Sequence, residues 1–120
     1  MIKGQGIDIV EMARIEKVYQ EHSERFVNRV LTPSEREQCN GARYLAKRWA
    51  AKEAIAKALG TGIGGQVSFQ DIEVLRQQNA SPSVTLTGGA ANCLTQKGAQ
   101  NVWLSISDEQ SYTVAIATIE

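Results

Sequence analysis

One stretch of the chain carries residue types that could do phosphate chemistry. Residues 49–62 read WAAKEAIAKALGTG and place Glu53 and Lys57 four residues apart, on one side of a helix. That spacing fits an ordinary helical ion pair worth about 0.2–0.5 kcal/mol. A carboxylate one turn from Trp49 and flanked by alanines is, however, expected to be partly desolvated. Such a charge needs a stronger partner than one flexible lysine, and a divalent metal ion would be one.

A second candidate carboxylate is Asp8, within GIDIVE at residues 6–11. Asp8 and Glu11 stand three residues apart directly before an amphipathic segment, which is the spacing of a capping box. Asp8 could equally be a metal ligand, because Mg²⁺ takes one or two protein carboxylates and completes its octahedron with water and phosphate oxygens. Spacing leaves the two interpretations about even, and a site shared with Glu53 requires the fold to bring both residues together.

A glycine-rich run follows the helix. GTGIGG at residues 60–65 contains the letters GxGxxG, but a dinucleotide-binding loop follows a strand and opens a helix, whereas this run closes a helix. Gly60 alone would suffice as a helix C-cap. We also expect a flexible loop whose backbone N–H groups could approach an anion beside Lys57.

The elements that must position these groups can be predicted from the apolar pattern. Residues 2–10 alternate as a strand, and residues 11–29 repeat apolar side chains at helical spacing. Thr32 is expected to start a short helix through a capping box with Glu35. The third helix is expected from Ala42 to Leu59.

The second half of the chain is richer in predicted strands. The whole pattern indicates one α+β domain over residues 1–120, with a mainly antiparallel sheet packed against the long central helix. The last two strands should form a hairpin. The expected elements are strands at residues 68–75, 84–86, 102–108 and 112–119, a turn at 77–82 and a short helix at 88–97.

Composition limits the class of protein. Hydrophobic residues make up 42% of the 120 and charged residues 22%, with 13 Lys and Arg against 13 Asp and Glu, which gives no sign of a nucleic acid or membrane partner. The N-terminus lacks the apolar run of a signal peptide, and no stretch approaches the roughly 18 apolar residues of a membrane span. Cys39 and Cys93 have no metal-binding spacing. We expect reduced cysteines, no zinc site and a soluble cytoplasmic protein.

Weaker candidates lie on the first predicted helix. His22, the only histidine, falls on the apolar stripe and is expected to be a packing or boundary residue, not a catalyst. Arg14, Arg25 and Arg29 are typical of a solvated face. A helix carrying them could also dock an acidic partner.

Five segments together resemble the holo-acyl-carrier-protein synthases, the small group of 4′-phosphopantetheinyl transferases. The resemblance runs in order over essentially the whole chain, and its most specific parts are GIDIV and KEAIAKALGTG. The five segments are GIDIVEMARIE, FVNRVLTPSE, RYLAKRWAAKEAIAKALGTGIG, SFQDIEV and LSISDEQSYTVAIATIE.

The resemblance implies the 4′-phosphopantetheinyl transferase fold and a specific reaction. Such enzymes move 4′-phosphopantetheine from coenzyme A to a serine hydroxyl of apo-acyl carrier protein, in support of fatty acid biosynthesis, with Mg²⁺ and with release of adenosine 3′,5′-bisphosphate. Glu53, directly or through water, is our hypothesis for the base that takes the serine proton. The resemblance further implies Asp8 and Glu53 as metal ligands, Glu53 and Lys57 as catalytic residues, and Arg48, Lys57, Gly60 and Thr61 as coenzyme A contacts.

The resemblance also implies a homotrimer that binds coenzyme A at subunit boundaries and docks the acidic carrier on its first helix through Arg14. The chain departs from the family in three places. Glu21 and Glu24 stand where some members carry basic side chains, which puts carrier preference in question. Ala80-Ser81-Pro82 replaces a frequent Gly-Lys-Pro, and Asp108 stands where some members have histidine.

Two other functions compete with this one. A non-catalytic module that binds an acyl carrier protein or a nucleotide would keep the fold and lose the transfer. A small Mg²⁺-dependent nucleotide hydrolase would use the same carboxylates with water as the nucleophile. Asp8, Glu53 and Lys57 argue against the first alternative, and Arg14 with the full-length resemblance argues against the second.

Overall fold

The structure is a computed structural model that describes residues 1–78 and 81–120. Among these residues, no helix has the length and apolar character needed to cross a membrane. In chain order, the elements are β1 (Gly4–Glu11), α1 (Met12–Val30), α2 (Pro33–Gln38), α3 (Ala42–Ala58), the 3₁₀ helix η1 (Phe69–Asp71), β2 (Ile72–Leu75), β3 (Ser83–Leu86), α4 (Gly88–Gln96), β4 (Val102–Asp108) and β5 (Tyr112–Ile119).

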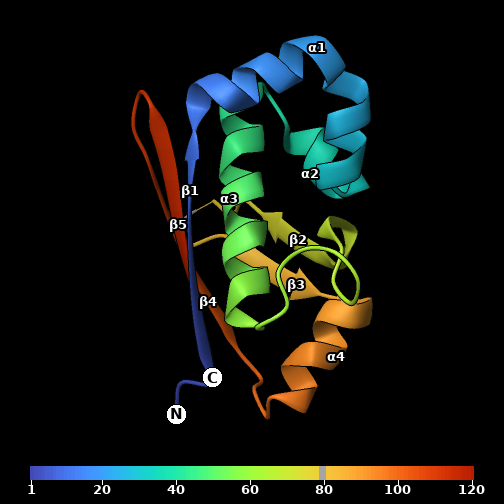
Figure 1. Ribbon diagram of the computed structural model, residues 1–120, viewed down its shortest axis with the longest axis vertical. Coiled ribbons are helices and arrows are strands. Elements are labelled where there is room, and N and C mark those ends of the chain that lie inside the picture. Colours follow the sequence, from blue (N-terminus) through green and yellow to red (C-terminus); the bar gives the residue numbers. More distant parts are fainter. Residues whose placement is uncertain (79–80) are drawn as a thin grey trace.

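Helix α3 forms the centre of the molecule (Figure 1). A sheet with the strand order β1-β5-β4 packs along one side of it, and α1 with the β2–β3 hairpin lies on the other. Both sheets are antiparallel throughout the described residues. The predicted α+β class, the central helix and the C-terminal hairpin are therefore confirmed. Because α3 is covered on two sides, its buried residues do not form one single stripe.

The strand expected at residues 68–75 is wrong in its first half, because Phe69–Asp71 forms a 3₁₀ turn. The backbone N–H of Ser68 donates to Asp71 Oδ2 at 3.2 Å, and the N–H of Asp71 donates to the carbonyl of Ser68 at 3.1 Å. These local bonds compete with a strand ladder, and alternation of apolar residues does not reveal them. The turn expected at residues 77–82 includes Asn79 and Ala80, which lie outside the described residues.

Helix α1 bends at His22, whose φ of −139° and ψ of 37° are not helical. The first part of the predicted apolar stripe is confirmed, since Met12 and Ile15 are buried. His22 itself is exposed to solvent at the bend, whereas Phe26 beyond it still packs against the core. The packing role expected for His22 is therefore wrong. The bend carries α1 over the end of α3 (Figure 1).

Strand β1 lies so close to α3 that two of its residues must be glycine. A Cβ atom on Gly6 would lie 2.1 Å from the carbonyl oxygen of Ala54, and one on Gly4 would lie 2.2 Å from that of Ala58. Alanines on the facing side of α3 permit this approach because their side chains are small. The contact fixes how closely β1 packs against α3, and with it the position of Asp8.

We expect Gly6→Ala to force β1 away from α3 and to destabilise the protein by about 1–3 kcal/mol, the usual cost of overpacking. The same displacement should reduce activity, because Asp8 lies two residues along the strand. Chemical denaturation and an activity assay measure the two effects. Gln5→Ala, at an exposed position of the same strand, is the control. A Gly6→Ala protein of unchanged stability would contradict the close contact.

Candidate functional site

A pocket of about 360 Å³ opens between β1, α1 and α3, and we call it the carboxylate pocket. β1 contributes Asp8, α3 contributes Glu53 and Lys57, and α1 contributes Arg14. The fold thus brings together four of the residues singled out in the sequence. Asp8 and Arg14 come from consecutive elements near the N-terminus and are distant in the chain from Glu53 and Lys57 on α3, so their meeting depends on the packing of β1 and α1 against α3.

Lys57 pairs across the pocket with β1 and not along its own helix. Its Nζ lies 3.1 Å from Asp8 Oδ1 and donates to the carbonyl oxygen of Ile7 at 2.9 Å. No ion pair or hydrogen bond joins Lys57 to Glu53 in the described part of the chain. The ordinary helical ion pair is therefore wrong, because the close approach of β1 offers Lys57 two acceptors that lie nearer.

Asp8 does not cap a helix. It lies inside β1, and the N-cap of α1 is Glu11, whose side chain makes no capping hydrogen bond. The capping-box interpretation of Asp8 and Glu11 is therefore wrong. The pairing of β1 with β5 continues through Glu11, which keeps Asp8 extended and directs its side chain toward α3.

The two carboxylates of the pocket are incompletely satisfied. Asp8 Oδ2 is buried and has no hydrogen-bond partner among the described residues. Burial raises the pKa of Glu53, the nearby charge of Asp8 raises it further, and Lys57 opposes both effects. A buried, unpaired carboxylate oxygen beside a second carboxylate calls for a cation, and these donors suit Mg²⁺.

A cation here would need ligands beyond the protein. In the described ranges, no group of three or more His, Cys, Asp or Glu side chains lies close enough to hold a metal ion. Mg²⁺ often binds through one or two carboxylates and completes its shell with waters and substrate phosphate oxygens. Asp8 and Glu53 fit that mode of binding.

Aromatic side chains form the inner wall of the carboxylate pocket. The rings of Phe26 and Trp49 stack with centroids 5.4 Å apart, and Trp49 also packs on Phe69 at 4.9 Å. This cluster joins the bent half of α1 to α3. It also lowers the polarity around Glu53. The partial desolvation expected from the neighbouring Trp49 is therefore confirmed.

One buried ion pair was not anticipated. Lys52 is fully buried on α3, and its Nζ lies 2.6 Å from Glu35 Oε1. The same ammonium donates to the carbonyl oxygens of Val30 at 2.6 Å and Phe69 at 3.0 Å. Burial lowers the pKa of Lys52, and the charge of Glu35 opposes that effect. All three N–H groups are thus satisfied, which is the condition for burying a charge.

The partner carboxylate is equally well satisfied. The capping box predicted at Thr32 and Glu35 is confirmed, with the Thr32 N–H donating to Glu35 Oε1 at 2.8 Å. Glu35 Oε2 accepts from the N–H of Val74 at 2.7 Å. Glu35 and Lys52 therefore tie α2, β2 and the end of α1 to α3. The capping motif marked Glu35 in the sequence, but nothing in the sequence paired it with Lys52.

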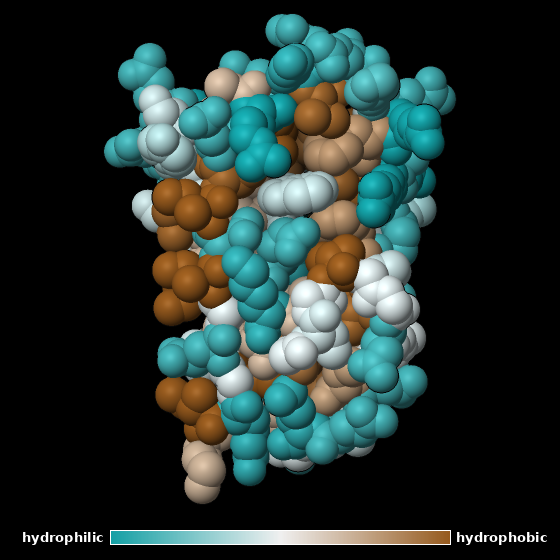
Figure 2. Space-filling view, viewed as in Figure 1, coloured by the Kyte–Doolittle hydropathy of each residue, from teal (hydrophilic) through white to brown (hydrophobic). Residues whose placement is uncertain are grey.

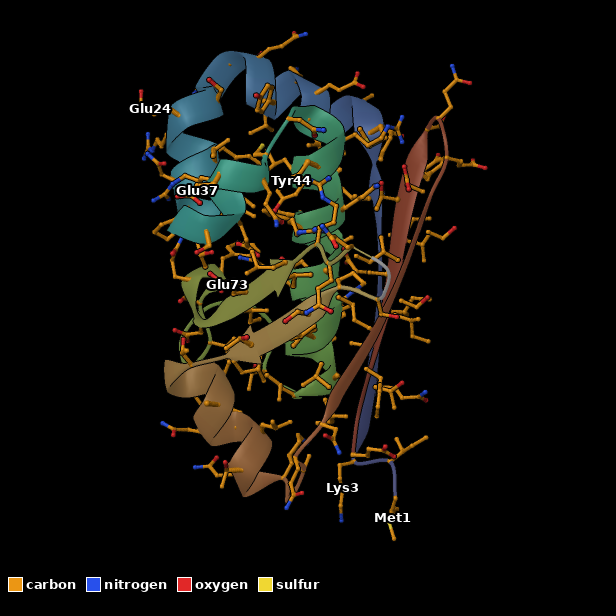
Figure 3. The ribbon with its side chains drawn as sticks, turned by 180° about the vertical axis from the view of Figure 1, so that it is seen from behind. Met1, Lys3, Glu24, Glu37, Tyr44 and Glu73 are labelled. Atoms are coloured by element: carbon orange, nitrogen blue, oxygen red, sulfur yellow. The ribbon has the colours of Figure 1, made fainter. Side chains whose placement is uncertain are left out.

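Arg48 lies in a different hollow, of about 220 Å³, which we call the basic hollow. Lys47, Arg76 and Asp108 line it too. Arg48 is only 4% exposed, its guanidinium lies 4.5 Å from the ring centre of Tyr44 (labelled in Figure 3), and its Nε has no partner among the described residues. Within one chain, the structure therefore separates Arg48 from the carboxylate pocket.

Asp108 neutralises part of the basic hollow. Its Oδ2 lies 2.8 Å from Arg43 Nη1, and its Oδ1 lies 3.5 Å from Lys47 Nζ. The hydrogen bond from Arg43, together with the charge of Lys47, holds the pKa of Asp108 below its usual value of 3.8. Asp108 thus pairs with two cations, of which Lys47 lines the basic hollow.

We expect Asp108→Asn to lower the free energy of unfolding by up to about 1 kcal/mol at neutral pH. The pKa of Asp108 is lower in the folded protein than in the unfolded one. The stabilisation is therefore complete at pH values above the unfolded-state pKa, and it is lost as the pH falls through the folded-state pKa. Urea denaturation of both proteins at neutral and strongly acidic pH measures the difference, which should vanish in acid. Glu109→Gln, an exposed neighbour, is the control. A difference that persists in acid would contradict the ion pairs.

The glycine-rich loop uses its own donors. Gly60 ends α3 with a φ of 84°, which confirms its role as a helix terminator. The N–H of Gly60 donates to the carbonyl of Lys57, and those of Thr61 and Gly62 donate to that of Ala56. The end of α3 therefore takes these three N–H groups, and contact between the rest of the loop and an anion stays a prediction. Neither Gly60 nor Thr61 lines the carboxylate pocket.

Comparison with known sequences places the chain in a family. The model of the 4′-phosphopantetheinyl transferase superfamily matches residues 4–117. A holo-[acyl-carrier-protein] synthase of Shewanella piezotolerans is 50% identical over 130 residues, covering 100% of this chain and 99% of the relative. A Vibrio cholerae protein of the same name is 45% identical over 124 residues, covering 100% and 98%.

Solved structures agree with the sequence matches. The crystal structure of the Neisseria meningitidis holo-[acyl-carrier-protein] synthase has a TM-score of 0.90 at 40% identity and covers 100% of this chain and 99% of that one. The Helicobacter pylori synthase in complex with coenzyme A has a TM-score of 0.86 at 34% identity, covering 97% and 99%. With the carboxylate pocket in place, these matches show that the chain belongs to the holo-acyl-carrier-protein synthases of the 4′-phosphopantetheinyl transferase superfamily.

Proposed function

We propose that this protein transfers 4′-phosphopantetheine from coenzyme A to a serine of apo-acyl carrier protein in the cytoplasm. The products are holo-acyl carrier protein, used in fatty acid biosynthesis, and adenosine 3′,5′-bisphosphate. The observation that carries the proposal is the carboxylate pocket with Asp8, Glu53 and Lys57, in a chain 50% identical to a synthase of that name. The Helicobacter pylori relative, solved with coenzyme A, supports coenzyme A as the donor.

Asp8 and Glu53 would hold Mg²⁺. The unpartnered Asp8 Oδ2 and the raised pKa of Glu53 support this assignment, since Lys57 alone does not balance the two carboxylates. When bound, the ion would neutralise charge that develops on the pyrophosphate oxygens of coenzyme A.

The protein side chains supply the rest of the chemistry. The serine oxygen forms a bond to the phosphorus that carries pantetheine, as the bond from that phosphorus to the nucleotide phosphate breaks. Glu53 would accept the serine proton, directly or through a water molecule. Lys57, half exposed at the rim, would neutralise charge on the leaving phosphate. Arg48, in the basic hollow, would hold a phosphate on the nucleotide side, with Gly60 and Thr61 as adjoining contacts.

The outer face of the three-stranded sheet supports a homotrimer. Apolar side chains line this face, which points away from α3, and Figure 2 shows them gathered along the flank where β1 and β5 lie. Exposed apolar patches of this kind mark interfaces. Coenzyme A bound at a subunit boundary would explain why the basic hollow and the carboxylate pocket are separate within one chain. The exposed residues are Ile7 at 61%, Ile9 at 63%, Trp103 at 58%, Ile116 at 42% and Tyr112 at 42%.

We expect Ile116→Glu to dissociate the assembly. A carboxylate in the centre of the apolar face would be desolvated without a partner at a subunit interface. Sedimentation equilibrium should give the mass of a trimer for the natural protein and that of a monomer for the variant. Thr85→Glu, an exposed position on the β2–β3 hairpin, is the control. A natural protein that sediments as a monomer would contradict the homotrimer.

An acidic carrier protein would dock on α1. Arg14 lies at the edge of the carboxylate pocket, and Arg25 and Arg29 line a neighbouring groove on the same helix. Glu21 and Glu24 are exposed, and Figure 3 shows Glu24 on the outer surface of α1 at the far end from Met1. The arginines therefore support docking despite the two acidic side chains.

One experiment separates transfer from its alternatives. The protein is incubated with apo-acyl carrier protein, coenzyme A and Mg²⁺, and the carrier is weighed by mass spectrometry. A phosphopantetheine adduct that disappears with EDTA is the expected result. Intact coenzyme A with no adduct would indicate a binding module, and cleaved coenzyme A with no adduct would indicate a hydrolase.

A further inference from the structure

The carboxylate pocket already contains a cation, the ammonium group of Lys57. Two of its three N–H groups are taken, one by Asp8 Oδ1 at 3.1 Å and one by the carbonyl oxygen of Ile7 at 2.9 Å. Both acceptors belong to β1, whereas the assigned catalytic role requires the ammonium to face a phosphate. In the structure the ammonium is therefore held by β1, and the proposed role requires it to turn toward a phosphate.

The partners differ in their freedom to move. Asp8 is held in the backbone ladder of β1, and its side chain is only 15% exposed. Lys57 is 50% exposed and ends a flexible stem of four carbons. Any exchange of partners at Asp8 therefore moves the lysine and leaves the aspartate in place.

We propose that Lys57 is an exchangeable counter-ion of the carboxylate pocket, which competes with the divalent cation for Asp8 and is released from Asp8 when the cation binds. The inference rests on the proposed function, because it takes Asp8 as a metal ligand. It adds a coupling: cation binding at Asp8 and Glu53 frees the ammonium for the phosphate. By linkage, the ammonium must in turn weaken cation binding.

The charges of the pocket set the direction of this coupling. Asp8 and Glu53 together bring two negative charges, and Lys57 offsets one of them. A partly exposed ion pair contributes little, so a divalent ion can displace the ammonium from Asp8 at small cost. The buried, unpartnered Asp8 Oδ2 leaves the carboxylate with an open acceptor toward such an ion.

The test measures Mn²⁺ affinity without coenzyme A, by electron paramagnetic resonance of the free ion. Lys57→Met is expected to bind Mn²⁺ about two- to five-fold more tightly than the natural protein, because the competing charge is gone. Lys57→Arg, which keeps the charge, should bind it as the natural protein does. Asp8→Asn should bind it much more weakly, which shows that the signal reports this pocket. Unchanged or weaker affinity in Lys57→Met, or undiminished binding in Asp8→Asn, would overturn the inference.

A second readout follows the release directly. Amine acylation followed by peptide mass spectrometry reports how freely each lysine reacts. Saturating Mn²⁺ should speed the labelling of Lys57 and leave that of Lys47, which pairs with Asp108, unchanged. Equal labelling of Lys57 with and without Mn²⁺ would contradict release. Failure of either test in a protein that forms the phosphopantetheine adduct rejects this inference alone, whereas success in a protein that forms no adduct rejects the proposed function alone.

Discussion

Glu53→Gln is expected to abolish phosphopantetheine transfer while the protein remains folded. The amide keeps the shape of the side chain but cannot accept the serine proton and is a poor ligand for Mg²⁺. Loss of a general base alone costs about 10²- to 10⁴-fold in rate, and loss of a metal ligand adds to it. The mass of the carrier protein after incubation with coenzyme A measures transfer.

The stability of Glu53→Gln should not fall at neutral pH. The folded-state pKa of Glu53 is raised above its usual value of 4.5, so the folded protein binds more protons than the unfolded one across that interval. Its stability therefore declines as pH rises through the interval, and the uncharged variant avoids that decline. Glu37→Gln, an exposed carboxylate on α2 (Figure 3), is the control for both measurements. Retained transfer in Glu53→Gln would sink the assignment of Glu53.

Lys52→Met is expected to be the most destabilising substitution, at about 3–5 kcal/mol. It leaves the Glu35 carboxylate buried without its counter-charge and deprives the carbonyls of Val30 and Phe69 of their donor. Small domains are stable by only about 5–15 kcal/mol, so the loss is a large share of the total. Denaturant unfolding monitored by tryptophan fluorescence measures it, since Trp49 lies one turn away on α3.

The double variant Lys52→Met, Glu35→Leu tests the physical reason. Replacing both members of a buried pair by apolar groups removes the uncompensated charge, so much of the stability should return. Lys47→Met, on the same helix but only partly buried, should change stability little. A double variant no more stable than Lys52→Met would show that the loss arises from packing and from hydrogen bonds to the backbone, and not from the buried charge of Glu35.

Local signals predicted most of the fold correctly. The capping box at Thr32, the termination of α3 at Gly60 and the C-terminal hairpin were all predicted, because each depends on residues that are neighbours in the chain. The error at residues 68–71 also comes from relying on a local pattern. Apolar alternation there suggested a strand, and the bonds between Ser68 and Asp71 that close the turn are not visible in a periodicity.

The sequence predicted which residues form the candidate site, but it did not predict which charged side chains pair with one another. Asp8, Glu53, Lys57 and Arg14 meet in one pocket, whereas Arg48 lies in another. Spacing along α3 suggested that Lys57 would pair with Glu53. The structure pairs Lys57 with Asp8, because the glycines of β1 let that strand approach the helix.

The sequence by itself therefore determined which groups are available for chemistry, the helices and strands that carry them, and, through its resemblance, the family. Only the tertiary structure decided which charge meets which. It joined Lys52 to Glu35, turned Lys57 toward β1 and left Asp8 Oδ2 without a partner. The reason is that helix and strand periods follow from neighbouring residues, whereas the energy of a charge depends on its burial and on partners that lie far away in the chain.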